Sequence, residues 1–181
     1  DKKLKKIKDV TVKMNASIQG QTISVTRYSK APNKFAMVMA MGPAVIQKQT
    51  FDGTVGKVSG MQGSSTMEGE ELEEMKISSK MHGDVYYASS GKTYKLLGIE
   101  AIEGKDCYKI EVTDKNGDKS SQWYDVATNL QVKSMQVREM DEEQGGGSMT
   151  IVSTFSDYKE VSGVKYAHKI SQSFGPQALD M

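Results

Sequence analysis

Residues 164–174 run Val164-Lys165-Tyr166-Ala167-His168-Lys169-Ile170-Ser171-Gln172-Ser173-Phe174, an alternating order typical of a β-strand with one dry and one wet face. Ser162-Gly163 precedes them and has the composition of a two-residue hairpin turn, in which glycine tolerates a positive φ. The segment before this turn, Met149 to Tyr158, is rich in β-branched and aromatic residues, and glycines at 145–147 separate it from Gln131 to Met140. Three consecutive antiparallel strands are therefore predicted.

Eight other segments show the same alternation or β-branched content, and turn residues such as Gly, Pro, Asn or Asp separate most of them. They are Val10–Ile18, Gln21–Ser29, Phe35–Met41, Val45–Phe51, Thr54–Ser59, Tyr94–Glu103, Lys105–Thr113 and Lys119–Asp125. The Asp52-Gly53 pair between two of these segments is one of the stronger hairpin signals. We therefore expect a mainly β protein of the α+β class, with about ten strands.

One clear helix is expected, over Glu68 to Met81, because acidic residues crowd its first turns and lysines follow toward its end. Leu72, Met75 and Ser79 form a narrow stripe at helical spacing. His82-Gly83 suits the end of such a helix. Because the apolar stripe is narrow, the helix is expected to lie on the sheet.

Composition limits the functional classes open to this chain. Its 181 residues fit one domain, and 37% apolar with 26% charged residues is typical of a folded protein. The net charge of +1 argues against nucleic-acid binding, which needs a basic face. No apolar run approaches the ~20 residues of a membrane span. Since the chain begins at Asp1 without Met, we expect a mature exported form or a fragment of a longer chain.

The residue types that usually carry chemistry are few. Cys107 is the single cysteine, which excludes an intrachain disulfide, and its parity with Lys109 and Glu111 predicts the wetter face of a strand. His82 and His168 lie far apart and belong to no metal-ligand or nucleophile motif. We therefore expect no enzyme activity, no cofactor and no bound metal.

Methionine is frequent, with 12 in the chain, and Met37, Met39 and Met41 share one face of one predicted strand. That strand, Phe35 to Met41, is apolar on both faces, which predicts covering material on each side. Methionine is flexible and polarizable, and it suits surfaces that accommodate irregular apolar shapes. Two interpretations are open: ordinary core filling, and an adaptable wall for an apolar ligand.

Short motifs give the chain a resemblance to a known family. Lys30-Ala31-Pro32-Asn33-Lys34-Phe35, followed by Phe51-Asp52-Gly53, resembles the signature of the periplasmic lipoprotein carrier LolA and its outer-membrane relative LolB. Further motifs resemble the lipoprotein-sorting-like domains of Gram-negative bacteria, some of which are appended to insulinase-type zinc peptidases. These motifs are Trp123-Tyr124-Asp125, Ser156-Asp157-Tyr158, Gly163-Val164-Lys165-Tyr166 and Gly175-Pro176-Gln177.

The resemblance implies a single strongly curved antiparallel sheet, a half barrel, with one to three helices closing its concave side over an apolar cavity. It implies one LolA-like domain over residues 1–181, in the periplasm or on the periplasmic face of the outer membrane. Two features depart from the family. Ala31 stands where the carriers have an arginine that is thought to hold the lid shut, and Arg27 lies away from that spot. The paired-histidine zinc motif of the peptidases is absent.

The ligand implied by the resemblance is the acyl chain of a lipid or lipoprotein. The residues expected to line the cavity wall are Val12, Met14, Ile18, Phe35, Met37, Met39, Met41, Tyr166, His168 and Ile170. Leu72 and Met75 are expected to face the cavity from the lid helix. The alternative hypothesis is a protein-interaction module of a larger envelope protein, with no lipid ligand.

Overall fold

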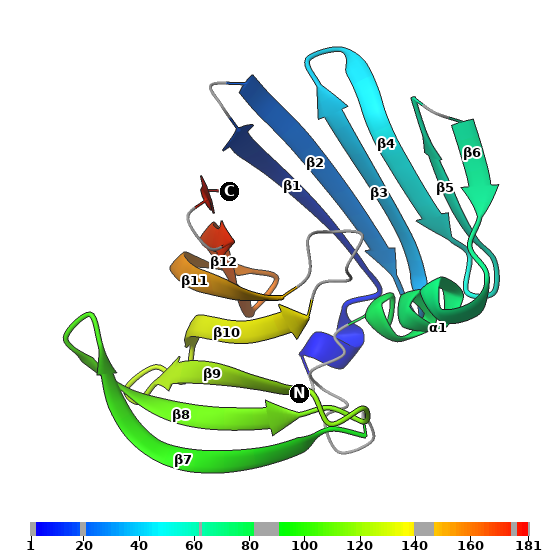
Figure 1. Ribbon diagram of the computed structural model, residues 1–181. Coiled ribbons are helices and arrows are strands. Elements are labelled where there is room, and N and C mark those ends of the chain that lie inside the picture. The colour runs from blue at the N-terminus through cyan, green and yellow to red at the C-terminus, as the bar shows by residue number, and fades with distance from the viewer. Residues whose placement is uncertain are drawn as a thin grey trace. The chain divides into compact units, whose positions relative to one another are not determined.

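A computed structural model describes residues 3–18, 21–61, 63–81, 91–139, 147–174 and 177–180. The chain divides into two compact units, Asp1–Tyr86 and Tyr87–Asp180, and each contains one antiparallel sheet (Figure 1). The expectation of one domain over residues 1–181 stays a prediction.

The first unit holds a six-stranded sheet in which neighbours in sequence are neighbours in space. Its strands are β1 (Asp9–Ile18), β2 (Gln21–Lys30), β3 (Lys34–Met41), β4 (Ala44–Phe51), β5 (Gly56–Gly60) and β6 (Gly63–Thr66). A short 3-10 helix, η1 (Leu4–Lys6), precedes the sheet, and the α-helix α1 (Gly69–Ser78) follows it. β4 and β5 form the predicted antiparallel pair, but Phe51 pairs with Gly56, so the turn between them spans residues 52–55 instead of Asp52-Gly53 alone. Gly53 in this turn has a φ of 109°.

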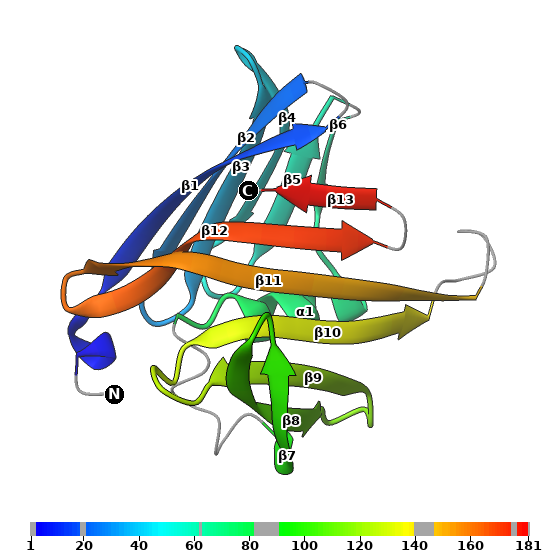
Figure 2. The ribbon, with the colours of Figure 1, turned by 90° about the vertical axis from the view of Figure 1, so that its left-hand side faces the viewer.

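The second unit holds a seven-stranded sheet, again of consecutive antiparallel strands (Figure 2). Its strands are β7 (Thr93–Ile102), β8 (Lys105–Thr113), β9 (Lys119–Asp125), β10 (Gln131–Glu139), β11 (Ser148–Val161), β12 (Val164–Phe174) and β13 (Gln177–Asp180). The hairpin predicted at Ser162-Gly163 is confirmed, since Val161 pairs with Val164 and the two turn residues have φ values of 53° and 80°. Such angles belong to the turns that match the twist of the flanking strands.

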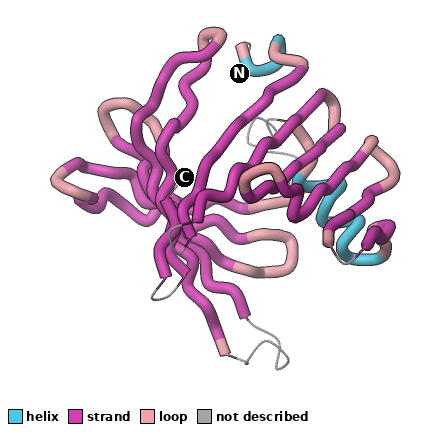
Figure 3. The backbone as a smooth tube through the Cα atoms, turned by 90° about the horizontal axis from the view of Figure 1, so that it is seen from above, coloured by secondary structure: helices cyan, strands magenta, loops and turns pink. Residues whose placement is uncertain are grey.

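The prediction of a mainly β, α+β chain is confirmed, but the prediction of a single strongly curved sheet is wrong. The strands form two sheets, and in the described part of the chain no strand of one pairs with a strand of the other. Strands dominate the trace and the α-helix is short (Figure 3). The physical reason lies between Thr66 and Thr93, where α1 interrupts the series of tight hairpins that would keep one ladder continuous.

Two strands escaped prediction, and the helix is shorter than predicted. Gly63–Thr66 is Gly-Ser-Ser-Thr, which has no apolar alternation, and it becomes strand β6 only by pairing with β5. Gln177–Asp180 likewise becomes β13 by pairing with β12. The predicted helix over Glu68 to Met81 is present as α1, ending at Ser78, while His82 and Gly83 lie outside the described residues.

Buried side chains gather differently in the two units. In the first, Phe51 and Met67 are each 2% exposed, and a Cβ added at Gly56 would meet the Met67 side chain. In the second, Trp123 is 2% exposed and Cys107 is fully buried. The prediction of a wet position for Cys107 is therefore wrong. Its parity with Lys109 is real, but Lys109 pairs directly with the buried Trp123 and Cys107 with the buried Asp125, so this is a covered face of the sheet and not the wet one.

Candidate functional site

The register of the first sheet brings the apolar residues of three strands onto one face. Three rows cross the strands, and each row has one residue from each of β1, β2 and β3. The residues of a row share a face because directly paired residues in an antiparallel sheet point to the same side. The rows are Val12–Arg27–Met37, Met14–Val25–Met39 and Ala16–Ile23–Met41. We call these nine residues, together with Phe35, the methionine face.

The methionine face is apolar and only partly covered. Val12 is 37% exposed and Met41 38%, whereas Ala16 is buried at 5%. Met14 and the other apolar members are half-buried. The structure thus brings the predicted residues of β1 and β3 together on one face. Ile18 belongs to β1 and pairs with Gln21, but the structure does not describe its side chain.

Arg27 is the charged member of the methionine face. Its guanidinium carbon lies 5.1 Å from the centre of the Phe35 ring, a cation–π distance, and partial desolvation lowers its pKa below the usual value. No ion pair joins Arg27 to another residue within the described ranges. A guanidinium without a carboxylate partner beside apolar side chains can pair with an anionic ligand group.

The opposite face of β3 is also apolar, as the sequence indicated. Val38 pairs with Thr26 on β2 and with Lys48 on β4, so its neighbours are polar. All residues from Phe35 to Ala40 are half-buried, with none fully covered. The predicted cover on both sides of this strand is therefore incomplete.

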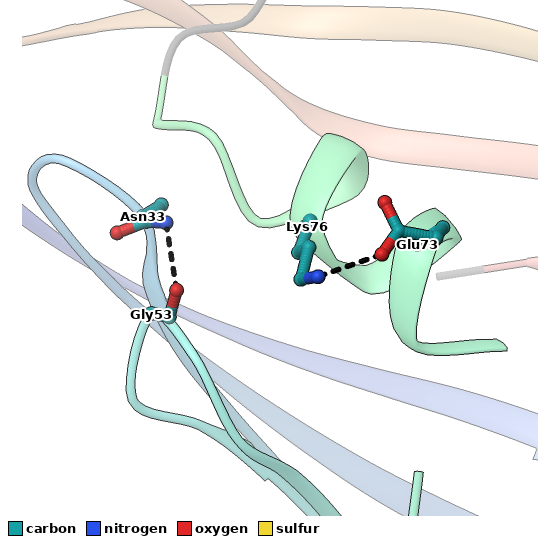
Figure 4. A network of polar contacts seen from close by, with 4 residues as sticks. All are labelled: Asn33, Gly53, Glu73 and Lys76. Atoms are coloured by element: carbon teal, nitrogen blue, oxygen red, sulfur yellow. Dashed lines mark hydrogen bonds and ion pairs between the residues drawn. The ribbon is translucent and has the colours of Figure 1, made fainter. Parts of the chain in front are cut away.

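The two family motifs of the first unit meet at one end of its sheet. Asn33 Nδ2 donates a hydrogen bond to the Gly53 carbonyl at 3.4 Å, as Figure 4 shows, and Phe35 pairs with Phe51. One carboxylate oxygen of Asp52 accepts the backbone N–H groups of Thr54 and Val55, both at 2.8 Å, and these bonds lower the Asp52 pKa. The motif residues therefore fix two turns against each other.

Helix α1 is attached to this same end of the sheet. After the helix, the Met81 N–H donates to the Pro32 carbonyl at 3.2 Å, and Lys76 and Glu73 on the helix form an exposed ion pair of 2.6 Å (Figure 4). Leu72 and Met75 are half-buried, and no residue of α1 is buried. The lid role of Leu72 and Met75 stays a prediction.

The predicted wall residues of the second unit lie on one face of β12, in a different sheet from the methionine face. Tyr166 and Ile170 are half-buried, whereas His168 is exposed. The Tyr166 hydroxyl is buried without a hydrogen-bond partner among the described residues, and burial raises its pKa. Sequence alternation placed these three residues on a common face, but it could not show that they belong to a separate sheet.

A groove of about 560 Å³ opens beside the last strands of the first unit, and sequence reasoning missed it. It is lined by Ile46, Gln47, Val58, Gly60, Met61, Gly63, Ser64 and Ser65. None of these residues was predicted, because half of the lining lies on or beside β6, which carries no strand pattern. The Gly60 to Gly63 turn was the available signal.

Comparison with known proteins gives matches at the level of structure. No protein-family model matches the chain, and no curated protein matches it in sequence. A DUF1329 family protein from Desulfovibrio piger matches with a TM-score of 0.60 and 16% identity, over 95% of this chain and 80% of that one. A LolA superfamily protein from Nitrosomonas europaea matches with a TM-score of 0.60 and 13% identity, over 99% and 87%. The fold is LolA-like.

A third match is a domain from Vibrio parahaemolyticus described as an outer membrane lipoprotein-sorting protein, with a TM-score of 0.58 and 12% identity, covering 96% of this chain and 82% of that one. The resemblance predicted from the motifs is therefore confirmed for the fold. Identities of this size show a shared fold alone. No helix in the described part of the chain is long and apolar enough to cross a membrane.

The Trp123-Tyr124-Asp125 motif has a structural role in the second unit. Trp123 Nε1 donates to Glu100 Oε2 at 3.2 Å, and the ammonium groups of Lys109 and Lys133 lie 5.1 and 4.9 Å from the indole centre. Asp125 accepts the Thr128 N–H and hydroxyl at 2.7 and 2.9 Å, which lowers its pKa. The motif thus anchors the sheet of the second unit, and within the described ranges no cluster of three potential metal ligands occurs.

Proposed function

We propose that this chain is a non-enzymatic domain of the cell envelope, and that its methionine face binds the acyl chain of a lipid or lipoprotein. The observation that carries the proposal is a partly exposed, mainly apolar face of ten residues on β1, β2 and β3, which includes four methionines, one phenylalanine and one arginine. Exposed apolar patches on folded proteins commonly mark binding sites. The structural neighbours described as LolA superfamily and lipoprotein-sorting proteins support the same reading.

Arg27 gives the proposed site a polar end. It pairs with Val12 on one side and Met37 on the other, and its guanidinium lies over the ring of Phe35. An acyl chain on the methionines would bring a carboxylate or phosphate head group within reach of this cation. Arginine suits such a contact because its planar fork pairs with both anions.

The energetics set a condition on how such a ligand binds. Each buried methylene contributes about 0.8 kcal/mol, and micromolar affinity requires about 8 kcal/mol net of association costs. A chain of roughly fifteen methylenes supplies about 12 kcal/mol if fully buried. Most of the chain must therefore leave water, and affinity should fall steeply as the chain is shortened.

The proposal is tested by titrating a fluorescent fatty acid into the purified protein and into Met39→Asp. Wild type should bind, with affinity falling about 15-fold when the probe loses two methylenes. Met39→Asp should abolish binding. A bound acyl chain would cover an unpaired carboxylate, and the desolvation of that carboxylate costs more free energy than the apolar contacts contribute.

The matched control is Val38→Asp, on the same strand and similarly half-buried but on the opposite face. It should fold, since Lys48 lies directly across from it, and bind like wild type. A second control, Lys169→Asp at an exposed side chain of β12, should also leave binding unchanged. Equal binding by Met39→Asp in a folded protein would contradict the proposed site. If wild type binds no probe, the alternative of an interaction module without a lipid ligand is favoured.

A further inference from the structure

Strand β7 is an edge strand that presents large apolar side chains to solvent. Among the described strands it ends the seven-stranded sheet, and β8 is its one neighbour in the ladder (Figure 1). Tyr94 is 44% exposed, Leu96 62%, Leu97 46% and Ile99 61%. A long apolar edge offers unpaired backbone groups and apolar surface together, and such edges recruit another strand.

The other sheet edges lack this combination. β6 and β13 are each four residues long, and the described side chains of β6 are glycine, serine and threonine. β1 carries Asp9 and Lys13, and among its described large apolar side chains Val12 alone is exposed, at 37%. Short strands and charged residues are the usual protection of an edge. Along its ten residues β7 carries two charges, Lys95 and Glu100.

We propose that β7 pairs with β7 of a second copy of this chain, antiparallel and about a two-fold axis between Leu97 and Gly98. In that register Lys95 lies opposite Glu100 of the other copy, and Leu96 lies opposite Ile99. The symmetry makes each of these pairs occur twice. The charges of β7 are therefore complementary to those of a second β7, which commits the edge to a copy of itself rather than to an unrelated strand.

The register also satisfies the requirement that opposing residues share a face. Leu96 and Ile99 face the same side because they pair with Ile110 and Tyr108 of β8, and Lys95 and Glu100 face the other side. Residues three or five apart normally alternate faces, but the irregularity between Leu96 and Gly98 shifts the parity by one. Because of this shift, the proposed register places Leu96 and Ile99 opposite each other on one face and Lys95 and Glu100 opposite each other on the other face.

Glu100 can accept the additional partner. Its contacts to Trp123 Nε1 and Lys109 Nζ, at 3.2 and 3.0 Å, both use Oε2. Oε1 remains for Lys95 of the second copy. Like charges placed directly across a ladder destabilise the pair, so exchanging either charge should disfavour self-association.

The experiment is sedimentation equilibrium of wild type, Lys95→Glu and Glu100→Lys, alone and mixed. Wild type should form a dimer at protein concentrations up to about 1 mM. Each variant alone should dissociate at least about tenfold more readily, because every cross-strand charge pair becomes like-charged. An equimolar mixture should recover dimer, since glutamates of one variant then face lysines of the other.

Lys169→Glu makes the same charge change at an exposed position inside the sheet and should dimerise like wild type. Glu100→Lys also removes the hydrogen-bond acceptor of Trp123, so this variant could be destabilised for another reason. A second pair of variants, which leaves Glu100 unchanged, tests the register independently. A mixture of Leu96→Cys and Ile99→Cys should form a disulfide-linked dimer under mild oxidation, while neither variant does alone. Monomeric wild type at the highest concentration, or no rescue and no cross-link in the mixtures, would overturn the proposal.

Discussion

Both sheets are built from consecutive antiparallel hairpins, yet they differ in how completely Trp123 and the methionine face are buried. The seven-stranded sheet buries Trp123 and surrounds it with Glu100, Lys109 and Lys133. The six-stranded sheet leaves the methionine face half-exposed. A rigid indole with satisfied polar partners holds one arrangement, whereas unbranched methionines can adapt to many. The second sheet is therefore expected to carry stability, and the first to carry binding.

Replacing the buried indole should have the largest effect on this contrast. Trp123→Ala is expected to lower the free energy of unfolding by about 3–5 kcal/mol, through lost burial and a cavity. It also leaves Glu100 without its indole donor. Urea unfolding followed by circular dichroism measures the loss. Trp123→Phe should cost less, and a change below about 1 kcal/mol for Trp123→Ala would show that the sheet does not depend on this residue.

Acidification should affect the turn of the second sheet more than that of the first. The pKa of Asp125 is depressed in the folded state, so its stabilising contribution is present above the unfolded pKa of about 4 and is lost as pH falls through the folded pKa. Asp125→Asn should therefore be less stable than wild type at neutral pH, and the difference should shrink below about pH 4.

Asp52 makes the matching comparison, because it also accepts backbone N–H groups but is exposed. Asp52→Asn should change stability less than Asp125→Asn does at neutral pH. Thermal melts of the two variants across pH measure both effects. A loss that is equally large for Asp52→Asn would show that burial is not what separates the two turns.

The smallest effect is expected on the methionine face itself. Met39→Ala should lower the free energy of unfolding by about 1 kcal/mol or less, since the residue is only half-buried. Met67→Ala, at a side chain 2% exposed, should cost about 2–4 kcal/mol. Both are measured by urea unfolding. A cost for Met39→Ala as large as that for Met67→Ala would assign Met39 to core filling.

Local patterns predicted most of the elements well. The alternation at Val10–Ile18 and the turns at Asp52-Gly53 and Ser162-Gly163 lead to observed strands and hairpins, because side-chain alternation and positive φ are set by neighbours in the chain. Alternation also placed Val12 with Met14 and Met37 with Met39, and the register of β1, β2 and β3 then brought the two pairs onto one face. Gly63–Thr66 could not be predicted, because its strand exists only through pairing with β5.

The sequence alone determined most of the strands, the helix α1, the LolA-like class of fold and the alternation of faces along regular strands, since these depend on local periodicity and short motifs. Tertiary structure alone decided that the strands form two sheets, that Cys107 is buried, and that Tyr166, His168 and Ile170 belong to a different sheet from the methionines. These properties depend on which strand edges pair and which side chains cover one another. Such pairings join residues far apart in the chain, and no local pattern encodes them.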